Sequence, residues 1–285
     1  MDRILVATDF STRSDRALRR ATLIAKRVGA SLTLVHVADG DRSKRLIDAE
    51  LDAARSLLEQ TAYSLRHEDK VAAEARVEID DVDSGILHSA AEIAADLVIL
   101  GPHRSRLRDV FVGTKVERVV RRSRFPLLVA VQPPSGPYRR ALLALDFDHA
   151  SRAAARAALA LGLFEHTDVV VMHAFDAPAE GMMRRAIDST ATIAEYVAGE
   201  RSNAEEKLGD LIRELGLPPT DQSVAAIHGT PARSILESAR QAGADLIVLG
   251  TNQRKGFERL LIGSVTEDVI REAQRDVLII PIEED

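Results

Sequence analysis

Residues 95–101 read ADLVILG and residues 244–250 read ADLIVLG, so one short pattern occurs twice in a chain of 285 residues. A second pattern repeats in the same order, because RILVATDF at residues 3–10 returns as RALLALDF at residues 140–147. Ordered repetition over such a distance indicates a duplicated domain. The chain is therefore predicted to consist of two tandem copies of one domain.

The segment Gln132–Pro137 separates the first set of repeated patterns from the second. Clusters of Pro, Gly and Ser such as this one are typical of linkers. We therefore predict one domain over residues 1–132 and a second over residues 138–285.

Each half alternates short runs of Val, Ile and Leu with longer helical stretches, as a parallel sheet covered on both faces requires. In the second half, the amphipathic run 186–215 takes the role of the second helix. The predicted fold class is α/β, with two tandem doubly wound domains, each a five-stranded parallel sheet in the order 3-2-1-4-5. In the first half we expect strands near residues 3–8, 31–37, 71–79, 96–100 and 126–131, and helices near 12–28, 43–66, 84–94 and 114–123.

The amino-acid composition excludes or disfavours several classes of function. The chain has 38 Lys and Arg against 44 Asp and Glu, which disfavours a dedicated nucleic-acid or anionic-membrane binder. It contains no Cys, so disulfides and thiolate chemistry are excluded. No apolar run has the length of a signal peptide or a membrane span, and the eight His residues show no close metal-ligand spacing. We expect a cytoplasmic protein without a metal site.

Ligands of open α/β sheets bind beyond the carboxyl ends of the strands where the strand order reverses, here between the first and fourth strands. The first strand leads to Asp9 or Asp146, and the fourth ends at Gly101 or Gly250. A glycine at a strand end lets the backbone bend or approach a ligand closely. A strand-ending Asp is also a common helix cap and a Gly a common turn residue, so a structural role stays open.

Two helix starts follow these strand ends, near Gly113 and Gly263. A helix start presents free backbone N–H groups and the positive end of its dipole, which suits a phosphate. The hydroxyls of Thr114, Ser264 and Thr266 add donors at the same places.

Taken together, the strand-Asp starts, the ADLVILG and ADLIVLG strands and the Gly-Thr or Gly-Ser helix starts resemble the universal stress protein family, present twice. The resemblance implies a stress-response binding protein. Its nucleotide-binding members share a Gly, two residues, a second Gly, nine residues, then Gly-Ser or Gly-Thr, and they bind ATP or related adenine nucleotides.

The resemblance implies an adenine-nucleotide site in each half, with the base near the first strand and the phosphates near the late helix start. In the second half the implied residues are Asp146, Ala174, Gly250, Asn252, Gly263, Ser264, Val265 and Thr266. In the first half they are Asp9, Val37, Gly101, His103, Arg104, Gly113 and Thr114.

The sequence departs from the family pattern in both halves. In the second half the nine-residue spacing is kept, while Gln253 replaces the second glycine. In the first half Arg104 replaces that glycine, and Gly113 arrives one residue early. ATP is therefore expected in the second half rather than the first.

Eight basic residues lie between Gly101 and Arg124, against Asp109 and Glu117. They predict either an anion-binding surface or a solvated helix face, and the second interpretation is favoured. His36 and His173 follow apolar strand residues and are expected to be packed, hydrogen-bonded structural residues.

The leading hypothesis is a regulatory binding protein without catalytic machinery, because no positioned base, nucleophile or metal cage is recognised. The alternatives are a slow nucleotide hydrolase or nucleotidyl-transfer enzyme, and an interaction module that binds no nucleotide. We also expect the apolar last strands, 126–131 and 277–282, to pair with each other as a pseudo-dimer, because unpaired edges are unfavourable. Further association into a homodimer, and a protein partner, stay open.

Overall fold

The structure is a computed structural model that describes the greater part of the chain. The described residues are 1–41, 43–102, 115–186, 190–217, 220–227, 230–253 and 263–283.

Each half contains five strands. In the first half these are β1 (Arg3–Ala7), β2 (Ser31–Asp39), β3 (Ala73–Asp80), β4 (Leu97–Leu100) and β5 (Leu127–Val129), with helices α1 (Thr12–Val28), α2 (Lys44–His67), α3 (Val82–Glu92) and α4 (Lys115–Arg122). The strands of the second half are β6 (Arg140–Ala144), β7 (Asp168–Phe175), β8 (Asp221–Ala226), β9 (Leu246–Gln253) and β10 (Asp276–Glu283). Its helices are α5 (His149–Ala160), α6 (Glu180–Ala186), α7 (Thr190–Glu214), α8 (Pro231–Ala242) and α9 (Ser264–Glu272).

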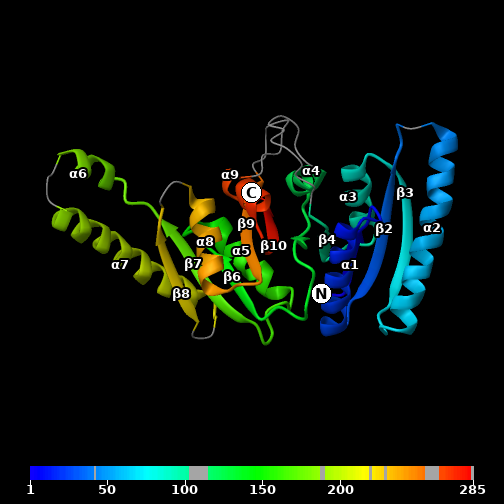
Figure 1. Cartoon of the computed structure of the whole chain (residues 1–285). Helices are drawn as coiled ribbons and strands as arrows, with labels where there is room; N and C mark the ends of the chain where they lie inside the picture. Colours follow the sequence, from blue (N-terminus) through cyan, green and yellow to red (C-terminus); the bar gives the residue numbers. More distant parts are fainter. Residues whose placement is uncertain are drawn as a thin grey trace.

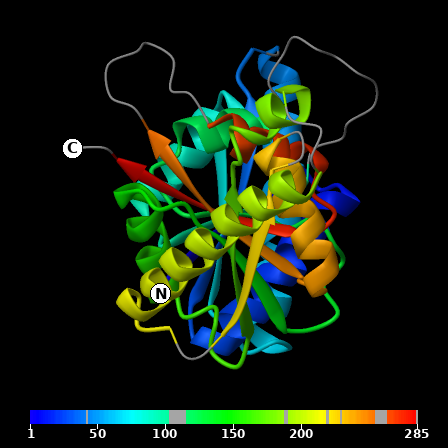
Figure 2. The same cartoon turned by 90° about the vertical axis from the view of Figure 1, so that its left-hand side faces the viewer.

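All ten strands form one sheet in the order β3-β2-β1-β4-β5-β10-β9-β6-β7-β8 (Figure 1). The strands of each half run parallel to one another, which confirms the predicted α/β fold class. The long helices α2 and α7 lie at opposite ends of the sheet, beside β3 and β8 (Figure 1). Figure 2 looks from the α7 end and shows helices on both sides of the twisted sheet.

Alternate side chains along each strand enter two different cores, as the period of two dictates. On β1, Ile4 and Val6 join the core beneath α1, α2, α5 and α7, whereas Leu5 joins the core beneath α3, α4, α8 and α9. These strands are buried on both faces, which explains their near-continuous apolar sequence.

The first helix begins and ends where the sequence predicts. The Ser11 side chain accepts a hydrogen bond from the Ser14 backbone N–H, which satisfies one free donor of the first turn. Gly29 closes the helix in the left-handed region, at φ 74°, where a residue without Cβ is favoured.

The repeated Ala-Asp-Leu pattern has a structural role in both halves. The Asp96 carboxylate accepts hydrogen bonds from the backbone N–H groups of Asp2 and Arg3, at 2.6 and 2.9 Å. Asp245 accepts from the N–H groups of Arg139 and Arg140 at 3.0 and 3.1 Å. Each Asp thus ties the start of the fourth strand to the start of the first.

The two halves meet through their last strands. β5 pairs antiparallel with β10, with Leu128 opposite Leu278 at the centre. The predicted internal pairing of the two apolar runs is therefore confirmed. It joins two five-stranded sheets into one and leaves neither β5 nor β10 as an edge.

A buried polar cluster seals this junction. The carboxylate of Asp276, which is fully buried, accepts hydrogen bonds from the Arg20 Nε at 2.9 Å and the Tyr138 hydroxyl at 2.7 Å. Its other oxygen accepts from the backbone N–H groups of Val131 and Gln132, at 2.8 and 3.1 Å. The cluster therefore connects α1 of the first half, the linker and β10 of the second half.

One sequence prediction about the second half is wrong in detail. The fourth strand does not end at Gly250, because β9 continues to Gln253 and pairs with β10 as far as Glu283. The predicted helix over 186–215 corresponds to α7, which spans Thr190–Glu214. The short helix α6 before it was not predicted.

The basic run of the first half lies in and before α4. Within the described residues, Arg122 donates to the buried Asp83 carboxylate at 2.6 Å, and the Arg118 Nε lies 3.6 Å from that carboxylate. Both arginines remain about half exposed, with 47% of each side chain accessible. The predicted solvated face of α4 is therefore partly ion-paired. Its Arg118 and Arg122 contact Asp83 of α3 and hold the two helices together. Arg104, Arg106 and Arg108 lie outside the described residues.

Candidate functional site

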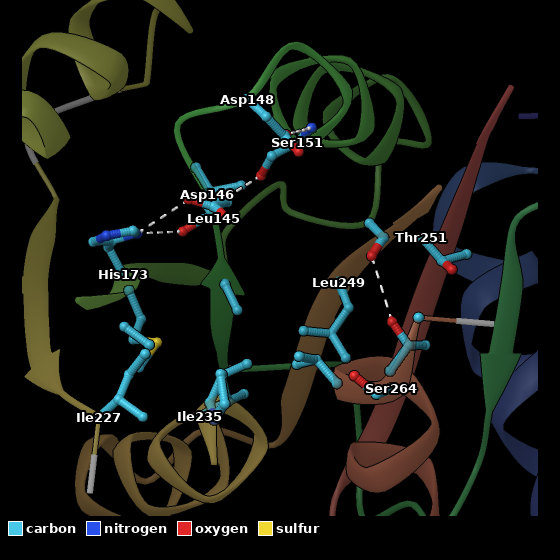
Figure 3. A pocket seen from close by; sticks show the side chains of 18 residues that line it. Leu145, Asp146, Asp148, Ser151, His173, Ile227, Ile235, Leu249, Thr251 and Ser264 are labelled. Carbon is cyan, nitrogen blue, oxygen red and sulfur yellow. Dashed lines mark hydrogen bonds and ion pairs between the residues drawn. The ribbon is translucent and has the colours of Figure 1, made fainter. Parts of the chain in front are cut away.

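A cavity of about 580 Å³ opens in the second half at the carboxyl ends of β6 and β7, beside β9 (Figure 3). Its volume is in the range of small-molecule sites. β9 sits between β10 and β6, but its pairing with β6 stops at Ala144 and Leu249, while β10 continues beside it. The overhanging end of β9 therefore forms a wall of the cavity.

The cavity brings together most of the residues predicted for the second half. Those that line it are Asp146, Ala174, Gly250, Gly263, Ser264, Val265 and Thr266. Asn252 lies on β9, and its side chain is outside the described part of the structure. The tertiary fold thus collects residues from three strands and one helix, up to 120 positions apart, around one space.

At one end of the cavity, Asp146 and His173 lie beside each other (Figure 3). The His173 Nδ1–H donates to the Leu145 carbonyl at 2.9 Å, and its ring lies 4.0 Å from the Phe147 ring, centroid to centroid. The predicted structural role of His173 is confirmed by this bond. The Asp146 side chain is 75% exposed, and its Oδ1 accepts the Phe147 N–H at 2.8 Å, so the carboxylate is held in place yet open to a ligand.

Three helices begin at the cavity, and they differ in capping. At α5 the Asp148 side chain accepts from Ser151 N–H, and at α8 the Thr230 hydroxyl accepts from Arg233 N–H. α9 begins after Gly263, with no side-chain cap among the described residues. Within the described residues, no side chain caps the first N–H groups of α9, and this helix start is the candidate anion-binding position of the cavity.

The two glycines of this site have different roles. A Cβ on Gly250 would lie 2.7 Å from the Ala154 Cβ, so this glycine lets α5 pack against β9. Around Gly263, in contrast, no described atom lies within 4 Å of the Cβ position. Gly250 is therefore required by the fold, whereas no atom of the described residues fills the space beside Gly263. Thr266 is buried, and its hydroxyl faces the Gly250 carbonyl at 3.5 Å rather than the open space.

The first half has a smaller cavity, of about 320 Å³, at the equivalent place. Asp9, Val37 and Gly101 line it as predicted, and His103, Arg104, Gly113 and Thr114 lie outside the described residues. A Cβ on Gly101 would lie 2.7 Å from the Arg13 carbonyl oxygen, so this glycine too admits a helix.

Charged side chains occupy this first cavity. The His36 Nδ1–H donates to the Thr8 carbonyl at 2.9 Å, and its Nε2 lies 3.1 Å from Glu50, so the predicted structural role of His36 is confirmed. Arg13 lies 3.7 Å from Asp9. Burial raises the pKa of Asp9, but hydrogen bonds from Ser11, with smaller contributions from Ser14 and Arg13, outweigh burial and hold the pKa below its usual 3.8.

The second cavity differs in its polarity. Among the described residues that line it, none is Lys or Arg, and its floor is apolar, with Met172, Ile235 and Leu249. The described part of the chain holds no group of three or more His, Asp or Glu side chains placed to bind a metal ion. None of its helices is long and apolar enough to cross a bilayer.

Sequence reasoning missed several lining residues, among them Ile227, Ile235 and Thr251. No repeated pattern marked them, because they reach the site through the segment after β8, the packing of α8 and the extension of β9. Phe147 was quoted within a repeated pattern, and its ring packs against the ring of His173, which lines the cavity.

Comparison with known sequences identifies the domain. The sequence model of the Universal stress protein family matches residues 1–131 and again residues 137–281. The chain is similar to a universal stress protein of Mycolicibacterium smegmatis, 25% identical over 97% of this chain and 96% of that one. One half is similar to a universal stress protein of Methanocaldococcus jannaschii, 31% identical over 50% of this chain and 82% of that one.

Solved structures agree at the level of the fold. A crystal structure of a universal stress protein from Archaeoglobus fulgidus superposes with a TM-score of 0.72 at 18% identity, covering 98% of both chains. A functionally unknown protein from Pseudomonas aeruginosa superposes with a TM-score of 0.68 at 19% identity, covering 99% of this chain and 92% of that one. The repeated patterns, the doubly wound halves and the two family matches agree, and the chain belongs to the universal stress protein family, with one family domain in each half.

Proposed function

We propose that the protein is a stress-response binding protein that holds an adenine nucleotide, with ATP as the leading candidate, in the cavity of its second half. The observation that supports this most directly is the uncapped start of α9, which opens into a cavity with an apolar floor. An anion-binding end and an apolar slot are what a phosphorylated nucleoside requires.

The phosphates would lie at the α9 end. The N–H groups of Ser264 and Val265 belong to the first turn of this helix, where no intrahelical acceptor is available. The positive end of the helix dipole favours the negative charge further. Gly250 and Asn252 near the end of β9, and Thr266 in the first turn of α9, lie at the same end of the site.

The base would lie at the β6 and β7 end. The exposed Asp146 carboxylate is an acceptor for an amino group or a ribose hydroxyl, and Ala174 leaves room beside it. The apolar side chains Met172, Ile235 and Leu249 offer the flat base an environment of low polarity.

The second half is the better candidate for a physical reason. Its cavity is the larger, at about 580 Å³ against 320 Å³. Carboxylates line both cavities, Asp9, Asp39 and Glu50 the first and Asp146 and Asp148 the second, so the preference for the second half rests on the larger volume and on the retained nine-residue spacing rather than on charge.

We further propose that binding is not accompanied by turnover. At the second cavity, among the described residues, no Ser or Thr hydroxyl donates a hydrogen bond to a His or carboxylate side chain that would take up its proton, and no group of His, Asp and Glu side chains is placed to bind a metal ion.

Calorimetric titration of ATP into the wild type and Gly263→Val tests the site. The Cβ of a valine at this position would meet no described protein atom within 4 Å, and the backbone there, at φ -56° and ψ 137°, suits a β-branched residue. The variant should therefore fold normally and lose ATP binding, because the side chain takes up ligand space.

Two control variants sharpen this test. Gly199→Val places the same side chain on α7, where no other described atom lies within 4 Å of the Cβ position, and it should bind ATP as the wild type does. Gly113→Val makes the corresponding sequence change in the first half and should also retain binding. Absence of wild-type binding at millimolar ATP would contradict the proposal and leave the interaction module in its place.

A further inference from the structure

The imidazole ring of His36 lies between two hydrogen-bond acceptors. Its Nδ1 lies 2.9 Å from the carbonyl oxygen of Thr8, just after β1, and its Nε2 lies 3.1 Å from the Glu50 carboxylate of α2. The side chains of His36 and Glu50 are 9% and 28% exposed, and both line the first cavity. The ring therefore connects β1, β2 and α2 at this cavity.

These two contacts require two hydrogens, whereas a neutral imidazole carries one N–H. With the hydrogen on Nδ1, the lone pair of Nε2 would face the Glu50 carboxylate. With the hydrogen on Nε2, the lone pair of Nδ1 would face the Thr8 carbonyl oxygen. Both contacts are hydrogen bonds only when the pair of His36 and Glu50 holds one further proton, on the ring or on the carboxylate.

The start of α2 is weakly stabilised by its own sequence. Its N-cap residue, Ser43, makes no side-chain capping hydrogen bond among the described residues, and the first turn contains no acidic residue. Lys44 and Arg45 instead place two positive charges beside the positive end of the helix dipole. Tertiary contacts must therefore hold the first two turns of this helix, residues 44–51.

The apolar part of those contacts is small. Ile47 and Leu51 pack with Ala38 of β2 and with Val77 of β3, in a cluster separate from the two main cores. From Leu58 onward the helix packs into a main core. Segments with few buried apolar contacts open locally at a lower free-energy cost than the core does. Residues 44–51 can therefore open while the rest of the domain stays folded.

We propose that residues 44–51 form a flap beside the first cavity and that the proton held by His36 and Glu50 keeps this flap closed. With the proton in place, both acceptors around the ring are satisfied. Without it, the lone pair of Nε2 faces the carboxylate, and the flap opens because water then solvates both groups. The flap belongs to the first half and does not depend on the nucleotide proposed for the second.

The proton balance gives the direction of the pH dependence. In an unstructured chain, His loses its second proton near about pH 6.5, and Glu is ionised above about pH 4.3. Between these two values the separated groups already carry the charges that the closed flap requires. Above about pH 6.5, opening releases a proton, so the open population rises by up to about tenfold per pH unit.

The other charged groups at this cavity come from the ends of β1 and β2 and from α1 and α4. They are two acidic and two basic residues, Asp9, Asp39, Arg13 and Lys115. Residues of these types do not ordinarily titrate between about pH 6 and pH 9. On the neighbouring strand β3, the residue opposite His36 is the uncharged Val77. The pH dependence in this range therefore belongs to His36 and Glu50.

The second half keeps the His but lacks the second acceptor. The His173 Nδ1–H donates to the Leu145 carbonyl at 2.9 Å, as His36 does to Thr8. Among the described residues, the carboxylate within 4.0 Å of this ring is that of Asp146, and it faces Nδ1 rather than Nε2. A neutral ring satisfies these contacts, so His173 is an internal reference for His36.

Hydrogen exchange of the whole protein, followed by mass spectrometry at about pH 6.5 and pH 8.5, tests the flap. After correction for the intrinsic pH dependence of exchange, the protection of residues 44–51 should fall about tenfold or more at the higher pH. Residues 58–65 lie in the same helix but in the main core, and their protection should not change. Equal protection of residues 44–51 at both pH values would refute the proposal.

Glu50→Gln removes the need for the proton and keeps the shape of the side chain. The amide N–H₂ group of Gln donates to the Nε2 of a neutral ring, so the protection of residues 44–51 should be the same at both pH values. Glu59→Gln is the matched control, because Glu59 is an exposed residue of α2, and it should behave as the wild type does. A pH dependence in Glu50→Gln equal to that of the wild type would contradict the role of Glu50.

Nuclear magnetic resonance of the wild type locates the proton without any substitution. At neutral pH, the ring nitrogen shifts of His36 and the carboxyl carbon shift of Glu50 should show one proton more than a neutral ring and an ionised carboxylate hold. The His173 ring should be neutral under the same conditions. A neutral His36 ring beside an ionised Glu50 would overturn the proposal, whatever the variants show.

Discussion

Replacement of Asp276 by alanine removes the acceptor on which the two halves and the linker converge. Four donors lose their partner at once: the Arg20 Nε, the Tyr138 hydroxyl, and the backbone N–H groups of Val131 and Gln132. Arg20 is itself 5% exposed, so its guanidinium would remain buried without a countercharge.

The expected loss of stability is large. Removing one partner of a buried ion pair destabilises a protein by about 3–5 kcal/mol, because the remaining charge is left uncompensated. Arg20 keeps a hydrogen bond to the Gly136 carbonyl, at 2.8 Å, and lies over the Tyr138 ring at 4.0 Å, and these contacts limit the loss. We therefore expect Asp276→Ala to lower the free energy of unfolding by about 3–4 kcal/mol, within the range for broken buried pairs.

Urea denaturation followed by far-ultraviolet circular dichroism measures this loss. Asp276→Asn should be nearly as unstable, because all four neighbours are donors and an amide presents an N–H₂ group to one pair of them. The control is Asp52→Ala, since Asp52 lies 3.6 Å from Arg55 on the exposed side of α2 and its side chain is 83% accessible. That variant should change stability by less than about 0.5 kcal/mol. A loss below about 1 kcal/mol in Asp276→Ala would refute the reasoning.

Three other predictions follow from the same structure. Burial, and then the neighbouring Asp276 carboxylate, raise the pKa of Tyr138 well above its usual 10.0, so its contribution to stability is complete below pH 10 and is lost as the pH rises further. Tyr138→Phe should therefore lose less stability than the wild type between pH 9 and pH 11 in urea titrations, and equal losses would contradict this. Residues 1–132 expressed alone should form a homodimer or aggregate, because β5 loses β10 as its neighbour; sedimentation showing a well-behaved monomer would count against it. ATP turnover by the whole protein should stay far below the roughly 1 per second of slow typical enzymes, and faster release of phosphate that Asp146→Ala abolishes would favour the hydrolase alternative.

The sequence predicted the elements of the first half closely because local rules decide them. The helix at 12–28 coincides with α1, since its Ser cap and terminal Gly act within one turn of the chain. The apolar strands were recognisable because both of their faces are buried. In the second half, the end of β9 was misplaced, because its length depends on β10, whose paired residues lie 30 positions further along the chain, as for Leu246 and Asp276.

The candidate site was predictable in part. Asp146 and Gly263 were found because repeated patterns and a family resemblance mark them, and both line the cavity. Ile235 was not found, because it reaches the cavity only through the packing of α8, which no local pattern reveals. The sequence left the role of Gly250 open between ligand approach and a structural one, and the close contact that a Cβ would make with Ala154 of α5 supports the structural role.

The sequence by itself determined that the chain is a duplicated α/β domain with two potential binding clefts, because periodicity, caps and repeats are local properties that survive in the linear order. Only the tertiary structure decided which residues meet across long separations. Arg20 and Asp276 are 256 positions apart, and neither has a charged counterpart in the other half that would have signalled the pair. Their contact arises because β5 and β10 pair antiparallel and bring α1 of one half against the first residue of β10 in the other. The free energy of such a contact depends on burial, and burial is a property of the assembled sheet rather than of any one segment.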